Sequence, residues 1–229
     1  MHILIVDDSL TYRLILRKIL GKIAGDFQIE SVDSGENALE AIRVNPPDLV
    51  LLDMTMPGID GIETLRRIKA GGFKAEVVMV SGLAADVAAA TLRALEGGAL
   101  DFITKPDAGN AADNEAQLGI AIGNILEVIA SKRSKSERPT KLVVRPIEPR
   151  PTIPSRGRPP DGKQFSIIVV GVSTGGPVAL GKLVPMIPSD FQLPIVIVQH
   201  MPPVFTAHLA AQLDRLPNSE FKRQLMVKK

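Results

Sequence analysis

The sequence of 229 residues has no cysteine and no tryptophan, and it holds a single tyrosine. Without cysteine the chain forms no disulfide, binds no metal through sulfur and has no thiol nucleophile. Aromatic residues make up only 3% of the chain, so its core must rest on aliphatic side chains and methionine. No apolar run reaches the roughly 18 residues that cross a bilayer, and the start turns acidic too early for a signal peptide. We therefore expect a cytoplasmic protein without membrane insertion.

The basic residues are concentrated in one short segment. Residues 131–164 carry ten Lys and Arg against three Asp and Glu, whereas residues 1–130 carry 11 against 19. The same segment holds seven of the 18 prolines and shows neither helical nor strand periodicity. Nucleic-acid binding is the alternative interpretation of such a segment, but no aromatic residues are interleaved. We interpret residues 131–164 as a flexible, Pro/Arg-rich linker between two domains and expect no nucleic-acid partner.

Before this linker, strand-like and helix-like patterns alternate five times. The expected strands are short, rich in β-branched residues and apolar on both faces, as in a parallel sheet covered by helices. They are Ile3–Val6, Phe27–Val32, Leu49–Leu52, Glu76–Val80 and Leu100–Thr104. Apolar residues at helical spacing lie between them and follow the last of them. Residues 1–130 are therefore predicted to form a doubly wound α/β domain.

Residues 165–229 predict a shorter α/β unit. The expected elements are a strand at Ser166–Val170, a helix at Val178–Val184, a strand at Ile195–Val198 and a helix at Ala207–Leu216. Two strands are few for an independent α/β core. We expect this part to be a fragment of a larger domain.

Acidic and basic side chains follow the expected strands of the first domain at one end. Asp7 and Asp8 end the first strand, Asp53 the third, Ser81 the fourth and Lys105 the fifth. In a parallel sheet these ends meet at one edge, where open α/β folds place their sites. Mg²⁺ and a lysine would both relieve the repulsion between the carboxylates. An aspartate in such a place can attack a phosphoryl group, although Asp7 and Asp8 alone would also suit a helix cap.

The motifs ILIVDDS, LVLLDMTMPGIDG, VVMVSG and ALDFITKP, in this order and spacing, resemble the flavodoxin-like receiver domain of two-component response regulators. The resemblance covers residues 1–130. It implies that Asp53 is the phospho-acceptor and that Mg²⁺ is bound by Asp8, Asp53 and the carbonyl of Thr55, with Asp7 assisting through water. It further implies phosphoryl binding by Ser81 and Lys105. Phe102 takes the position of the switch aromatic residue.

A glycine-rich turn, GVSTGGP, follows the first expected strand of the second part. It fits G-x-S-x-G at Gly171, Ser173 and Gly175, a pattern that exposes a serine on a tight strand-to-helix turn. A P-loop is excluded because Pro177 stands where lysine is required. A serine nucleophile needs a base. His200 follows the next strand, so the two side chains are expected at the same sheet edge.

The segments VGVSTGGP and PIVIVQHMPPVFTAHLAAQL resemble the beginning of the catalytic domain of the chemotaxis protein-glutamate methylesterases. The resemblance implies that Ser173 is the nucleophile and His200 the general base. It implies hydrolysis of glutamate methyl esters and deamidation of glutamines on methyl-accepting chemotaxis receptors, without a cofactor for hydrolysis. A chemotaxis histidine kinase would be the phosphodonor, and phosphorylation would relieve inhibition by the receiver.

The chain also departs from that family, whose triad aspartate lies roughly a hundred residues after the serine. After Ser173 the only carboxylates are Asp190, Asp214 and Glu220, and none of them matches that position. We therefore expect a truncated methylesterase domain of doubtful activity. The alternative function is a catalytically inactive phosphoacceptor with an esterase remnant. A DNA-binding regulator is disfavoured because nothing after the linker resembles a helix-turn-helix.

Overall fold

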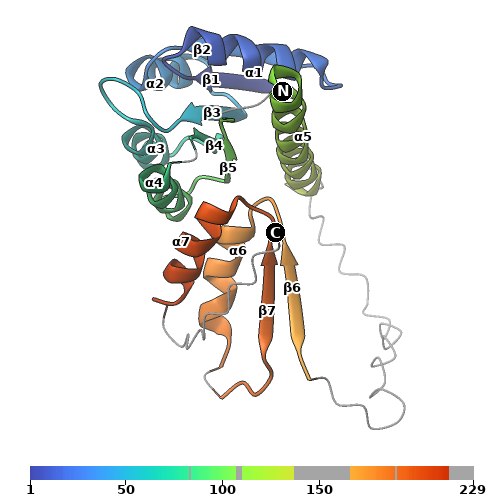
Figure 1. Cartoon of the computed structure of the whole chain (residues 1–229). Coiled ribbons are helices and arrows are strands. Elements are labelled where there is room, and N and C mark those ends of the chain that lie inside the picture. The colour runs from blue at the N-terminus through green and yellow to red at the C-terminus, as the bar shows by residue number, and fades with distance from the viewer. Residues whose placement is uncertain (83, 107–109, 137–165, 189, 217–229) are drawn as a thin grey trace, which may run out of the picture.

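A computed structural model describes residues 1–82, 84–106, 110–136, 166–188 and 190–216 (Figure 1). Glu220 and residues 137–164 of the predicted linker lie outside the described residues. None of the helices in the described ranges combines the length and the apolar character needed to cross a membrane.

The first part of the chain is a five-stranded parallel sheet flanked by helices. Its strands are β1 (His2–Val6), β2 (Gln28–Val32), β3 (Leu49–Asp53), β4 (Glu76–Ser81) and β5 (Asp101–Thr104), in the order β2-β1-β3-β4-β5. Its helices are α1 (Leu10–Lys22), α2 (Gly35–Val44), α3 (Gly61–Ala70), α4 (Ala85–Glu96) and α5 (Ala111–Ser136). The predicted doubly wound fold is confirmed, with one bound of each strand shifted by one residue.

Polar side chains fix where the helices begin. The N-cap side chains of Ser9, Ser34 and Asp60 accept hydrogen bonds from backbone N–H groups in the first turns of α1, α2 and α3. Each cap satisfies one of the amides that a helix start leaves unpaired. Each cap residue is the last residue of the loop that leaves β1, β2 or β3, so it fixes where that loop ends and the helix begins.

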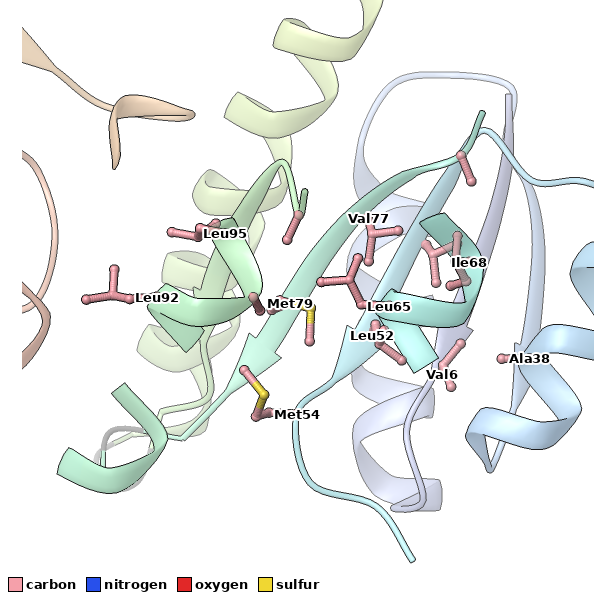
Figure 2. Close-up of a cluster of buried hydrophobic side chains, with 14 of the residues drawn as sticks. Val6, Ala38, Leu52, Met54, Leu65, Ile68, Val77, Met79, Leu92 and Leu95 are labelled. Atoms are coloured by element: carbon pink, nitrogen blue, oxygen red, sulfur yellow. The ribbon is translucent and has the colours of Figure 1, made fainter. Parts of the chain in front are cut away.

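Two apolar layers cover the sheet. Side chains of α1 and α5 pack on one face, against residues such as Ile3, Leu49 and Val78. Side chains of α2, α3 and α4 pack on the other face. Figure 2 shows part of this second layer, in which Leu65 and Ile68 of α3 lie over Leu52 and Val77 of the sheet. Strands β1, β3 and β4 are apolar in the middle, and their polar site residues lie at or just after their carboxyl ends.

The second part is a two-stranded parallel sheet with helices on one face. It consists of β6 (Ile168–Val172), α6 (Gly176–Leu183), a 3₁₀ turn (Val184–Met186), β7 (Ile195–Gln199) and α7 (Pro203–Leu213). The expected element order is correct, but β6 begins two residues later than predicted and α7 begins and ends earlier. Alternate residues of both strands face the helices, whereas Val169 and Val198 on the opposite face are exposed.

The two parts pack against each other through α4. Figure 1 shows α6 and α7 beside α4, on the side away from β2. Leu92 and Leu95 of α4 belong to the same buried cluster as Leu180, Leu209 and Leu213. The apolar core is therefore continuous between the two parts.

Helix α5 is longer than the sequence pattern indicates. We placed the start of the linker at residue 131, but the helix continues to Ser136. Two ion pairs join this last stretch to the sheet: Lys132 contacts Glu76 at 2.9 Å, and Arg133 contacts Asp48. Both acids stand at the starts of strands. Lys132 and Arg133, the first two basic residues of the predicted linker, therefore belong to α5 and connect it to the sheet.

Candidate functional site: a carboxylate edge and a serine loop

The predicted acidic residues meet at the carboxyl edge of the large sheet. Asp7 follows β1 and Asp53 ends β3, and these strands are neighbours. One carboxylate oxygen from each of Asp7, Asp8 and Asp53 lies within 4.8 Å of the others. Asp7 and Asp53 are buried and Asp8 is exposed. At this edge the three carboxylates are therefore close enough to bind one cation together.

Lys105 lies between two of these carboxylates. Its Nζ is 2.8 Å from Asp7 Oδ2 and 2.9 Å from Asp53 Oδ2, and only 15% of its side chain is exposed. Burial raises the pKa of the Asp53 carboxyl, and the hydrogen bond and charge of Lys105 oppose that rise. Burial alone would lower the pKa of Lys105, but the two carboxylates raise it above its ordinary value. Each group thus favours the charged form of the other.

The donor set fits Mg²⁺. Magnesium prefers oxygen ligands and usually keeps waters and phosphate in its coordination shell. Three clustered carboxylate oxygens, one of them on an exposed side chain, provide such ligands and leave room for others. The backbone of Thr55 lies at the same place, since its N–H donates to Asp53. The predicted ligands Asp7, Asp8, Asp53 and Thr55 are therefore brought together.

The backbone around Asp53 is closely packed. The Met54 N–H donates to Val80 O at 2.9 Å, and the Gly61 N–H donates to Met54 O at 3.1 Å. A Cβ at Gly61 would lie 2.2 Å from Asp53 O, so only glycine lets α3 begin this close to the end of β3. The Asp53 side chain thus starts from a fixed position.

The predicted phosphoryl-binding residues frame the same space. Ser81 ends β4, its side chain is fully buried, and its Oγ has no hydrogen-bond partner among the described residues. Leaving a buried hydroxyl without a partner is costly, which favours a ligand oxygen at this place. Ser81 and Lys105 lie at the carboxyl ends of paired strands, because Ser81 is in register with Thr104, the residue before Lys105.

Sequence reasoning missed two residues of this edge, both on α1. Arg13 Nη1 donates to Asp7 O at 2.6 Å and to Asp8 O at 3.1 Å, which holds the loop after β1. The Tyr12 ring lies against Lys105, with its centroid 4.4 Å from Nζ. An aromatic residue one helical turn after the acidic pair was the only sequence signal.

The serine loop is shaped by glycine and by one glutamine. Gly175 has φ +73°, a left-handed conformation that suits glycine, and precedes the first turn of α6. Gln199 Nε2 donates to Ser173 O at 3.1 Å and to His200 O at 3.2 Å. The glutamine therefore ties the loop after β6 to the loop after β7. Sequence reasoning had assigned no role to Gln199.

Ser173 and His200 lie at the same edge of the small sheet, as predicted. Val172 is in register with Gln199, so the two residues directly follow paired positions. Both are exposed, and no hydrogen bond joins their side chains. Of the later carboxylates, Asp190 and Asp214 are exposed, and within the described residues neither forms an ion pair with His200. The structure thus places the predicted nucleophile and base at the same sheet edge, and neither of the two described carboxylates forms an ion pair with the histidine.

The receiver-like part contacts the serine loop directly. The Gly175 N–H donates to Asp101 Oδ2 at 3.0 Å, and the Thr174 side chain bonds the same carboxylate. Burial raises the pKa of Asp101, against the hydrogen bonds from Phe102, Gly175 and Thr174. Sequence reasoning gave Asp101 no role. It holds the amide beside the candidate nucleophile.

Phe102, the predicted switch residue, lies at the same contact. Its ring stacks on Phe205 of α7, with centroids 4.4 Å apart and planes 19° from parallel. The Phe205 side chain is fully buried. The strand that carries Lys105 at its end therefore also carries, at its start, the two residues that touch the second part of the chain.

Comparisons with known proteins agree with this division. Residues 3–113 match the family described as response regulator receiver domain, and residues 168–224 match the CheB methylesterase family. The receiver domain of Thermotoga maritima CheB is 31% identical, with a TM-score of 0.50, over 57% of this chain and 96% of that one.

Relatives similar over nearly the whole chain are methylesterases by name. The protein-glutamate methylesterase/protein-glutamine glutaminase of Desulfotalea psychrophila is 39% identical and that of Bacillus subtilis 37%, over 97% and 96% of this chain. The chain spans 62% of the length of each. The chain therefore consists of a response regulator receiver domain followed by part of a CheB methylesterase domain.

Proposed function

We propose that Asp53 accepts a phosphoryl group and that this is the first function of the chain. One Asp53 carboxylate oxygen attacks phosphorus in line, an oxygen–phosphorus bond forms, and the donor's bond to phosphorus breaks with its electron pair leaving on the donor. Lys105 exchanges its contact with the carboxylate for one with a phosphoryl oxygen, and the Ser81 hydroxyl donates to another. Mg²⁺ bound by Asp7, Asp8, Asp53 and the Thr55 carbonyl would neutralise charge on the transferred group.

The observation that carries this proposal is the Lys105–Asp7–Asp53 arrangement. Lys105, held 2.8 and 2.9 Å from two buried carboxylates, favours the ionised form of Asp53 against the burial that raises the pKa of that carboxyl. An ionised oxygen is required for attack on phosphorus. The Ser81 hydroxyl, which has no hydrogen-bond partner among the described residues, adds a donor where a phosphoryl oxygen would lie. The physiological donor is expected to be a chemotaxis histidine kinase.

Labelling with a small radioactive phosphodonor tests this function. Asp53→Asn should abolish acid-stable, base-labile phosphate on the protein, and EDTA should do the same to the native chain. Asp26→Asn is the matched control, because Asp26 is an exposed acid at the opposite edge of the same sheet. Undiminished labelling of the Asp53→Asn variant would refute the assignment.

For the second part we propose methylesterase chemistry of the type named for its relatives. The Ser173 hydroxyl attacks the carbonyl of a glutamate methyl ester and His200 takes the hydroxyl proton. The ester C–O bond then breaks, His200 gives the proton to the departing methoxide, which leaves as methanol, and water hydrolyses the acyl-serine. The N–H groups at the start of α6 would stabilise the oxyanion. Glutamine side chains would be deamidated by the same steps, with ammonia leaving. Methyl-accepting chemotaxis receptors are the proposed substrates.

Regulation follows from the contact at the serine loop. The Asp101 carboxylate of the receiver accepts a hydrogen bond from the Gly175 N–H, close to Ser173, and the Phe102 ring stacks on Phe205 of α7. A substrate carbonyl approaching Ser173 would compete with the Asp101 carboxylate for that amide. We propose that phosphorylation at Asp53 shifts β5 and loosens this contact, which opens the loop.

A second candidate function is phosphoacceptance without hydrolysis, which is favoured by a His200 that no described carboxylate orients. In other serine hydrolases, disabling that acid lowers the rate by a factor on the order of 10⁴. The test is methanol release from methylated receptor membranes by the 229-residue chain, phosphorylated or not, beside Ser173→Ala. Release clearly above the Ser173→Ala control supports the esterase, and equal release supports the inert phosphoacceptor.

A further inference from the structure

Tyr12 has a place at the phosphoryl site that the proposed chemistry does not use. It is the only tyrosine of the chain and lies in the first turns of α1. The centroid of its ring is 4.4 Å from Lys105 Nζ, and its hydroxyl donates to Pro106 O over a long 3.5 Å. The ring thus lies along the Lys105–Pro106 segment, next to the ammonium.

The Lys105 ammonium has three neighbours of different kinds. Two are the carboxylates of Asp7 and Asp53, and the third is the Tyr12 ring. A cation within about 6 Å of a ring centroid is attracted by the π face, and this attraction grows where water is excluded. Only 15% of the Lys105 side chain is exposed, so the ring contact is largely desolvated.

Helix α1 holds this ring in place. The Tyr12 N–H donates to the N-cap oxygen of Ser9 at 3.4 Å, and the Ser9 N–H donates to Asp7 Oδ1 at 2.9 Å. The next residue, Arg13, bonds the carbonyls of Asp7 and Asp8. The start of α1 is therefore tied to the same loop that supplies two of the carboxylates, and the Tyr12 ring has a fixed distance from the site.

Phosphorylation changes one of the three neighbours, Asp53, but not the ring. Once Asp53 carries the phosphoryl group, its attacking oxygen is esterified and no longer pairs with Lys105 as a carboxylate. The ammonium must then follow the phosphoryl oxygens, which lie farther from the strand end. A π face attracts a cation without demanding one direction, so it holds the ammonium before and after transfer.

We propose that Tyr12 is a positioning residue for phosphoryl transfer, which keeps the Lys105 ammonium aimed at the phosphoryl group through its aromatic face. The proposal rests on the proposed phospho-acceptor function of Asp53. It predicts that aromaticity matters at position 12 and that the hydroxyl matters little. It also predicts no change in metal binding, because Tyr12 is not one of the proposed metal ligands.

The test compares Tyr12→Phe, Tyr12→Leu and, as a control on the same helix, the exposed Leu14→Ala. The initial phosphorylation rate with a small phosphodonor is measured over a range of Mg²⁺ concentrations. Tyr12→Leu should lower the maximal rate about two- to five-fold, as expected for loss of one cation–π contact. Tyr12→Phe and Leu14→Ala should retain the native rate, and the half-saturating Mg²⁺ concentration should be the same in all four proteins.

A second measurement reads the contact without any phosphorylation. In nuclear magnetic resonance spectra, the Lys105 side-chain protons of the native protein and of Tyr12→Phe should be shifted upfield by the ring. Tyr12→Leu should lose this shift while urea unfolding shows it to be folded. A Tyr12→Leu protein with native rate, or with an altered Mg²⁺ requirement, would overturn the proposal. Failure of the Asp53 assignment would appear separately, as labelling of Asp53→Asn.

Discussion

At the scale of single residues, the phosphoryl site depends on charge balance. Asp7 and Asp53 are buried together, and Lys105 is the cation that contacts both. Because burial disfavours ionised carboxylates, the pair keeps its charges only with a cation nearby. The lysine thus has a structural role before any phosphoryl group arrives, and it competes with a metal ion for the same oxygens.

Replacing Lys105 by Met should therefore destabilise the protein and strengthen metal binding. Removing one partner of a buried ion pair costs about 3 kcal/mol, and Mg²⁺ should restore part of this loss. The Mg²⁺ affinity should rise several-fold, because no ammonium competes for the oxygens. Urea unfolding with and without Mg²⁺ measures both effects. Equal stabilisation of native and variant proteins by Mg²⁺ would contradict the account.

The same variant should change the alkaline limb of the stability curve. The pKa of Lys105 is raised in the fold, so its stabilisation is complete below the ordinary value of 10.5. It is lost as the pH rises through the raised folded value. The stability difference between native and Lys105→Met proteins should therefore shrink in that range and stay constant near neutral pH.

At the scale of elements, strand ends were predictable and contacts between elements were not. The runs of β-branched residues predicted where each strand ends, and therefore predicted that Asp53, Ser81 and Lys105 lie at the carboxyl edge of the sheet. This works because all strands of a parallel sheet end at the same edge. The roles of Asp101 and Gln199 depend on how two units pack. Neither residue belongs to a local sequence pattern that would predict its contact with the serine loop. The end of α5 was misplaced because its ion pairs with Glu76 and Asp48 are long-range.

The last turns of α5 offer a test at this scale. Arg133→Ala should cost less than about 1 kcal/mol, since the pair with Asp48 is partly exposed and screened by solvent. The Arg133 hydrogen bond lowers the pKa of Asp48, so its stabilisation is present above pH 3.8 and is lost as the pH falls through the lowered value. The variant should therefore lose less stability than the native protein on acidification. An unchanged acid limb would show that the pair contributes nothing.

At the scale of the whole molecule, the two parts share one apolar core. Phe205 is fully buried and stacks on Phe102, and α7 packs along α4. If phosphorylation loosens this contact, thermodynamic linkage requires the reverse: loosening the contact must favour the phosphorylated state.

Phe205→Ala should accordingly lower stability by roughly 3 kcal/mol, as for other buried Phe→Ala changes. It should also raise the fraction of phosphorylated Asp53 at a fixed concentration of phosphodonor. Val204→Ala, a neighbouring and partly exposed position on α7, is the control. Phosphate incorporation and urea unfolding are measured on the same preparations. An unchanged phosphorylated fraction in Phe205→Ala would show that the contact and the phosphoryl site are not coupled.

The position of Tyr12 also has an optical consequence. In a chain without tryptophan, near-ultraviolet emission comes almost entirely from this one phenol, whose ring lies against the Lys105 ammonium. Movement of that ammonium alters the electric field at the phenol. We therefore expect the tyrosine emission intensity to change when Asp53 is phosphorylated, without any added label. Rapid mixing with a phosphodonor would follow the reaction in real time in the unmodified protein, with no background from the second half of the chain.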